Sequence, residues 1–128
     1  MNLNFLPYSS IQTALLLFLC VPLSFAYDDR EKESKQQVEF GIDVAQRGLW
    51  QEAVYRWEKA VELDPNNASA RNNLAVAYEQ EGKFELANEE YEKALEIDSN
   101  NLYILQNYEL FMEAYERKKR SEQRSSRN

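Results

Sequence analysis

The sequence repeats itself with a period of 34 residues. Residues 58–67 read EKAVELDPNN and residues 92–101 read EKALEIDSNN, so seven of the ten positions are identical. The same spacing joins Gly48 to Gly82 upstream of this block. A period of this length is typical of repeat proteins, in which each unit buries its apolar face only against its neighbours. We therefore expect a chain that holds a partner and does not convert a substrate.

The first 26 residues carry no charged side chain and contain a short apolar segment. Its core, residues 11–21, is shorter than the roughly 20 apolar residues that a membrane-spanning helix needs. Ser24 and Ala26 have the spacing that a signal peptidase requires, and Pro22 is expected to break the helix before the cut. We therefore expect residues 1–26 to export the protein to a periplasm or to the exterior. The alternative is an uncleaved anchor, which would then be the only membrane contact.

The composition after this segment argues against catalysis, metal binding and nucleic-acid binding. The chain has no histidine, and its single cysteine, Cys20, lies in the apolar segment. Residues 27–116 carry a net charge of −12, which disfavours contact with phosphates, whereas residues 117–128 carry +5. The cluster of Glu89, Glu90 and nearby acids lies on a regular helical pattern without a calcium-binding loop. We expect no enzyme, no cofactor, no metal and no nucleic-acid partner.

The spacing of apolar residues from Arg30 onward is helical, with breaks where helices should end. Gly48 and Gly82 are expected to stop two helices, and the Asn-Asn pairs at 66–67 and 100–101 to cap the following ones. No sustained alternation predicts a strand. The fold class is therefore all-α, a short α-solenoid of antiparallel helix hairpins, with helices expected at about 30–47, 50–63, 68–81, 84–97 and 102–120.

The spacing of small and bulky residues resembles that of tetratricopeptide repeats. Small residues stand where helices cross closely, at Gly41, Ala53, Ala60, Ala75, Ala87 and Ala94. Bulky residues stand between them, at Phe40, Trp50, Trp57, Leu74, Tyr78, Phe84 and Tyr91. The resemblance divides the chain into a spacer (27–33), repeat 1 (34–67), repeat 2 (68–101), a capping helix (102–120) and a basic disordered tail (121–128). Glu109 departs from the pattern at a small-residue position, as expected for a last helix with a polar outer face.

The resemblance implies a concave groove, lined by the first helix of each unit, that binds a protein or peptide segment. Asn73 and Asn107 fall where an asparagine often bonds a bound peptide's backbone, for which a side-chain amide offers a donor and an acceptor. Glu39 also lies on this surface. The expected groove residues are Lys35, Val38, Ile42, Ser69, Asn72, Asn73, Val76, Gln80, Tyr103, Gln106, Asn107 and Leu110.

The groove lacks the lysine, arginine and asparagine pattern with which some of these domains clamp a terminal carboxylate. Val38 and Ile42 replace the lysine and asparagine of the first unit, and Tyr103 and Asn107 replace the basic pair of the third. An apolar floor is expected instead, suited to an apolar or amphipathic segment. The residues of that floor are Val38, Ile42, Val76 and Leu110.

Two functions fit this organisation. The first is an exported adaptor that binds a protein segment in the concave groove. The second is a self-associating structural or assembly subunit of a cell-envelope complex, in which the repeat face or the fifth helix packs against a copy. A stable dimer with a covered groove would favour the second function, and a monomer with an open groove would favour the first.

Overall fold

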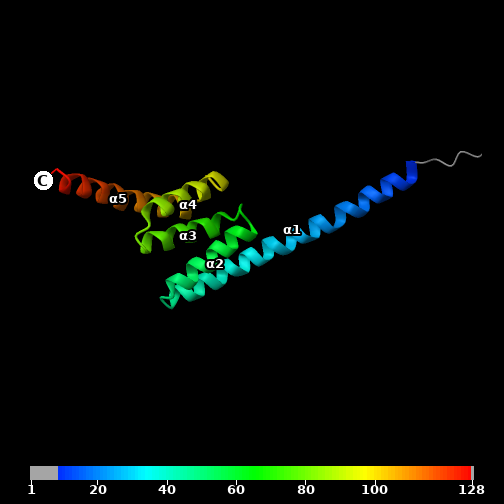
Figure 1. Ribbon diagram of the computed structural model, residues 1–128, viewed down its shortest axis with the longest axis horizontal. Helices are drawn as coiled ribbons and strands as arrows, with labels where there is room; N and C mark the ends of the chain where they lie inside the picture. The colour runs from blue at the N-terminus through cyan, green and yellow to red at the C-terminus, as the bar shows by residue number, and fades with distance from the viewer. Residues whose placement is uncertain (1–8, 128) are drawn as a thin grey trace, which may run out of the picture.

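The computed structural model describes the backbone of residues 9–127 and the side chains of residues 26–127. The described part is entirely helical apart from short connections, which confirms the predicted all-α solenoid. Figure 1 shows the order along the chain. The five helices are α1 (Ser9–Gln46), α2 (Trp50–Leu63), α3 (Ala68–Gln80), α4 (Phe84–Ile97) and α5 (Leu102–Ser125).

The helices pack as two antiparallel hairpins followed by one more helix (Figure 1). Helix α2 lies against the C-terminal part of α1, α4 lies against α3, and α5 contacts both α3 and α4. The two hairpin turns contain Gly48 and Gly82, with φ of 78° and 74°. These angles lie in the left-handed region, which glycine enters without strain. The predicted helix stops are confirmed.

Asparagine side chains cap α3 and α5. The Asn67 side chain accepts a hydrogen bond from the backbone amide of Ala70, and the Asn101 side chain accepts from those of Tyr103 and Ile104. These bonds satisfy amides that have no partner within the helix. The second asparagine of each Asn-Asn pair is therefore the cap, and the two caps lie one period apart.

The first hairpin depends on a close approach between α1 and α2. Gly41 lies under the Trp57 indole, and a Cβ atom at position 41 would overlap the ring. The Trp57 Nε1 group donates a hydrogen bond to the Val38 carbonyl at 3.2 Å. Near the other end of the contact, the buried Ser34 Oγ donates to the Ala60 carbonyl at 2.8 Å. Both bonds reach backbone carbonyls, so they form only when the two helices lie close together.

Aromatic side chains fill the contact between α4 and α5. The Tyr91 and Phe111 side chains are fully buried, and their ring centroids lie 5.2 Å apart. Burial, together with the neighbouring Glu79 carboxylate, raises the pKa of the Tyr91 hydroxyl. Tyr91, Phe111 and the rings stacked around them define the aromatic cluster, which contains Phe84, Tyr91, Tyr108, Phe111 and Tyr115.

Helix α1 is longer than the sequence predicts. It begins at Ser9 and not near Arg30, and it continues through Pro22 and the expected spacer at 27–33. A proline removes one backbone donor, and a helix can continue past it when the residues on both sides favour helix. The middle of the expected spacer is also tied to repeat 1, because the Arg30 Nη2 group donates to the Glu62 carbonyl at 3.1 Å.

The expected export segment lies only partly within the described residues, since residues 1–8 lie outside them. Its cleavage stays a prediction. Among the described residues, no helix combines the length and the apolar character needed to cross a membrane.

Helix α5 ends at Ser125, later than the expected end at residue 120. The residues expected to form the start of a disordered tail are therefore helical. Lys118 and Glu122 form an i,i+4 ion pair at 3.8 Å, and Arg124 complements the helix dipole in the last turn. These interactions favour the additional turn of helix.

The Gly41→Ala variant tests the close approach of α1 and α2. Helix propensity alone would stabilise the protein by up to about 1 kcal/mol. Overlap with the Trp57 indole should instead lower the free energy of unfolding by about 1–3 kcal/mol. Urea unfolding followed by circular dichroism measures the change, with the exposed Ser69→Ala substitution in α3 as the control. A Gly41→Ala protein more stable than the wild type would contradict the packing described here.

Candidate partner-binding groove

A depression with a volume of about 330 Å³ lies where α1, α2, α3 and α5 meet. None of its lining side chains is charged. Aliphatic and aromatic groups make up most of the surface, and its polar groups include the side-chain amides of Gln46 and Asn73. We call this depression the concave groove, and its lining residues are Ile42, Ala45, Gln46, Trp50, Trp57, Asn73, Val76 and Tyr103.

Four of the residues predicted from the sequence meet at this groove: Ile42, Asn73, Val76 and Tyr103. They come from α1, α3 and α5, the first helix of each unit. Ile42 is 40% exposed and Tyr103 is 64% exposed, so both offer apolar surface to a partner. The repeat period therefore brings residues from distant parts of the sequence to one surface.

The other exposed predicted residues lie outside the groove lining. Leu110 is 60% exposed and lies two turns beyond Tyr103 on α5, so it extends the apolar surface along that helix. Lys35 forms an exposed ion pair with Glu31 at 2.7 Å. Three further predicted residues are exposed at the surface without lining the depression: Ser69, Gln80 and Gln106.

Two predicted groove residues, Val38 and Asn72, are buried instead. Val38 is 7% exposed in the core of the first hairpin, and Asn72 is 1% exposed. They occupy the same position one period apart, where the first helix of the next unit covers the side chain. Gln106, the third residue of this series, is exposed because no helix follows α5 among the described residues. The expectation that Val38 forms part of the groove floor is therefore wrong.

Asn72 instead links the two asparagines expected to contact a partner. The Asn107 Nδ2 group donates to the Asn72 Oδ1 atom at 3.1 Å, and the Asn72 Nδ2 group donates to the Asn73 Oδ1 atom at 3.4 Å. These bonds use one amide atom each of Asn73 and Asn107. Among the described residues, the Asn73 Nδ2 donor and the Asn107 Oδ1 acceptor make no hydrogen bond, so they can pair with a partner's backbone. We call these three residues the asparagine chain.

Trp50 lines the groove although the sequence analysis assigned it only to packing. Its counterpart one period later, Phe84, stacks on Phe111 and Tyr115. One period before Phe111 and Tyr115, the sequence has Ala77 and Glu81, and neither of them is aromatic. Trp50 thus lacks the aromatic neighbours of Phe84 and stays 36% exposed. A comparison of the two units position by position could have revealed this difference.

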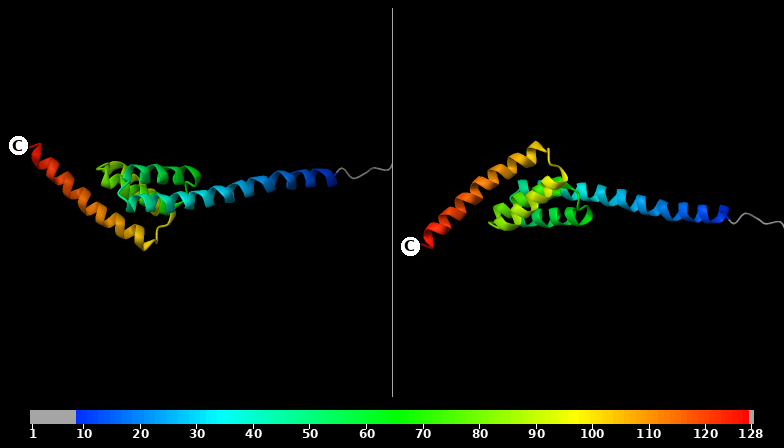
Figure 2. Two further views of the ribbon diagram at one scale, coloured as in Figure 1. Left: turned by 90° about the horizontal axis from the view of Figure 1, so that it is seen from below. Right: turned by 90° about the horizontal axis from the view of Figure 1, so that it is seen from above.

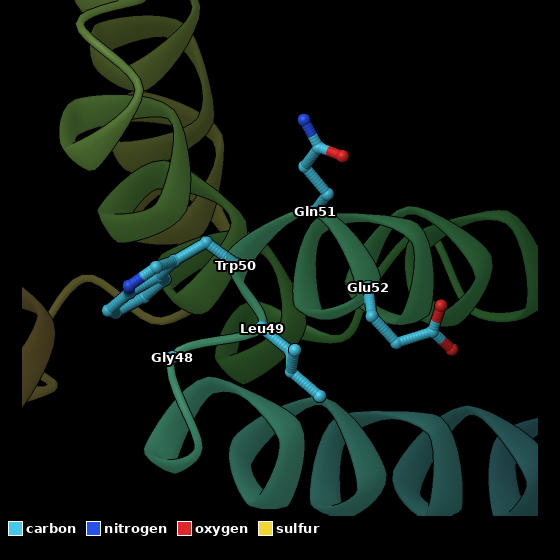
Figure 3. Close-up of a pocket in the computed structure, with 5 residues that line it drawn as sticks. All are labelled: Gly48, Leu49, Trp50, Gln51 and Glu52. Atoms are coloured by element: carbon cyan, nitrogen blue, oxygen red, sulfur yellow. The ribbon is translucent and has the colours of Figure 1, made fainter.

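A second depression, of about 420 Å³, lies at the turn between α1 and α2. Five consecutive residues line it, from Gly48 to Glu52, and Figure 3 shows their side chains pointing in different directions. In that view Leu49 points toward α1, and Trp50 extends away from Glu52. Because the side chains do not converge, the concave groove is the better candidate site.

Substitutions in the asparagine chain should separate a structural from a binding role. Asn72→Ala removes a buried side chain with two hydrogen bonds, so the free energy of unfolding should fall by about 1–2 kcal/mol. Asn73→Ala removes one acceptor, at the longer distance of 3.4 Å, and leaves the Asn72–Asn107 bond in place, so it should cost less, about 1 kcal/mol or below. Chemical unfolding of both variants measures the difference. Equal losses of stability in the two variants would show that Asn72 is not the central residue of the asparagine chain.

Comparison with known families and structures agrees with the helical repeat. A family model described as "TPR repeat" matches residues 44–82, and one described as "Tetratricopeptide repeat" matches residues 68–101. A search of curated proteins found no match.

The solved structures that are similar to this chain include the following two. One comes from a study titled "Functional Characterization of Pseudomonas Aeruginosa pilF", with 36% identity and a TM-score of 0.65. The match covers 75% of this chain and 43% of that one, so this chain spans less than half of its relative's length. The other is the Arabidopsis OM64 TPR domain, with 26% identity, a TM-score of 0.64, and coverage of 70% and 74%.

These matches agree with the hairpin packing, the glycine turns and the period. Tetratricopeptide repeats are protein–protein interaction scaffolds and are typically not catalytic. Residues 44–101 of this chain consist of tetratricopeptide repeats within a short all-α solenoid.

Proposed function

We propose that this protein is an exported adaptor whose concave groove binds an apolar or amphipathic segment of another protein. The observation that carries the proposal is the lining of the groove. It combines partly exposed apolar side chains with Asn73, the member of the asparagine chain that lines the groove, and it holds no charge. Such a surface suits a segment that contributes apolar side chains and backbone hydrogen bonds.

Apolar surface supplies the attraction in this proposal. Tyr103, Leu110 and Ile42 are exposed by 64%, 60% and 40%. Burial of apolar surface contributes roughly 25 cal/mol per Å², and aromatic residues often dominate the energy of an interface. Tyr103 and Trp50 are therefore the expected anchors.

The asparagine chain would orient a bound segment through hydrogen bonds. Its hydrogen bonds hold the Asn73 and Asn107 amides in place before a partner arrives. Groups that are already positioned lose less conformational entropy on binding. One donor and one acceptor could then pair with the backbone of a bound segment.

The absence of charge from the groove lining supports recognition of an internal segment and not of a chain terminus. A terminal carboxylate is normally bound by cationic side chains or by backbone amides. The groove lining contains neither lysine nor arginine. Acidic residues elsewhere favour a partner with basic flanks, because residues 27–116 carry a net charge of −12.

Site-specific photo-cross-linking in the native cell tests the groove. A photoreactive amino acid at position 103 should capture a partner, and the same amino acid at Leu86, a 45% exposed residue of α4, should not. Adding Val76→Asp to the position-103 protein should abolish capture, because a carboxylate would enter an apolar surface. Equal capture at both positions, or capture that survives Val76→Asp, would contradict the proposal. Circular dichroism checks that the variants remain folded.

Export is part of the proposal and rests on residues 1–26. They carry no charge, and they end in the Ser24 and Ala26 pattern. The mass of the intact protein from the cell's extracytoplasmic fraction tests this. A chain that starts at or near Tyr27 is expected. A chain that retains Met1 would support the anchor, and recovery only from the cytoplasm would contradict export.

A further inference from the structure

The outer face of α5, with the turn that follows it, carries three glutamates and then three arginines. We call this set the charged stripe. Every member is exposed, and none lines the concave groove. The charged stripe consists of Glu109, Glu113, Glu116, Arg120, Arg124 and Arg127.

The five members within α5 share one side of the helix, and Arg127 follows in the turn beyond its end at Ser125. Successive members are three or four residues apart, which keeps them on one face. Glu109, Glu113, Glu116 and Arg120 line a shallow depression of about 520 Å³, together with Tyr108 and Met112. The buried residues Ile104 and Phe111 lie on another side of α5, toward the body. The stripe therefore faces away from the rest of the chain.

The neighbouring lysines contact the chain itself, whereas the arginines of the stripe do not. Lys118 Nζ lies 4.1 Å from the centre of the Phe84 ring, and Lys119 Nζ lies 4.2 Å from that of Tyr115. Among residues 26–127, the ion pair found for α5 joins Lys118 to Glu122. The stripe arginines are therefore available to another molecule, as is the exposed Arg117, which lies outside the stripe.

We propose that α5 pairs along the charged stripe with α5 of a second copy, in antiparallel orientation. A two-fold axis between residues 116 and 120 would place each glutamate beside an arginine of the other copy. The pairs are Glu116 with Arg120, Glu113 with Arg124, and Glu109 with Arg127, each formed twice. An arrangement related by a two-fold axis is self-complementary and closes at two copies.

The shape of the molecule favours this orientation. The N-terminal half of α5 rests on α4 through Phe111, and its C-terminal half extends beyond the body (Figures 1 and 2). Antiparallel pairing places each projecting half on the supported half of the other copy. Parallel pairing would put glutamate against glutamate and arginine against arginine, which is unfavourable.

The association should be weak and sensitive to salt. Exposed ion pairs contribute little individually, and salt screens them. The stripe contains no aliphatic residue, and Tyr108 and Met112 at its edge add only part of their surface. Because the groove lining is not used, the pairing can hold or fail independently of the proposed function.

Sedimentation equilibrium of the full chain, in a neutral density-matched detergent, tests the pairing. At low salt we expect a monomer–dimer equilibrium that shifts to monomer as salt is added. The triple variant Glu109→Arg, Glu113→Arg, Glu116→Arg should raise the dissociation constant at least about tenfold. Arg120→Glu, Arg124→Glu, Arg127→Glu should do the same. In a protein that carries all six substitutions, each glutamate–arginine pair becomes an arginine–glutamate pair. This protein should therefore dimerise again.

The matched control is Asp29→Arg, Glu33→Arg, Glu96→Arg, which changes the net charge equally at exposed positions outside the stripe. It should dimerise like the wild type. A monomeric wild type at low salt, triple variants that dimerise normally, or no recovery in the six-fold variant would each overturn the proposal. A monomer that binds phosphatidylserine vesicles through Arg120, Arg124 and Arg127 would overturn it in favour of a lipid surface.

Discussion

Close contact between paired helices is the constraint on which the rest of the structure depends. The small residues at the crossing points, such as Ala53, Ala60, Ala87 and Ala94, are completely buried. Their size allows backbone carbonyls to come within reach of side chains on the neighbouring helix, as with Ser34. Each unit offers the next a surface of similar shape, and the alignment of the first helices that forms the groove follows from that regularity.

The sequence predicted the fold well because packing positions recur with the period. Glycine turns, asparagine caps and small crossing residues all repeat, and local chemistry decides each of them. The start of α1 and the end of α5 were predicted less well. The helix continues through Pro22 and beyond Arg120, because a single proline or a run of charges is a weak signal when the neighbouring residues favour helix. Propensity gives only a prior, which the surrounding residues can override.

The candidate groove was only partly predictable. The period places Ile42 and Val76 on one surface, but it does not say which positions the next helix will cover. Val38 and Asn72 became buried for that reason, whereas Gln106 stayed exposed at the end of the array. A residue's role in such a fold depends on its place in the series as much as on its position within a unit.

The continuous helix α1 sets the distance between the groove and the start of the helix. The same helix contains Ser9 and the groove residue Ile42, and a rise of 1.5 Å per residue separates them by about 50 Å. If the N-terminal segment is retained as an anchor, α1 acts as a rigid spacer that keeps the groove at a constant distance from the anchored end. Cleavage near Tyr27 would remove nearly half of α1, so processing would decide whether the groove is held at a fixed place or diffuses with its partner.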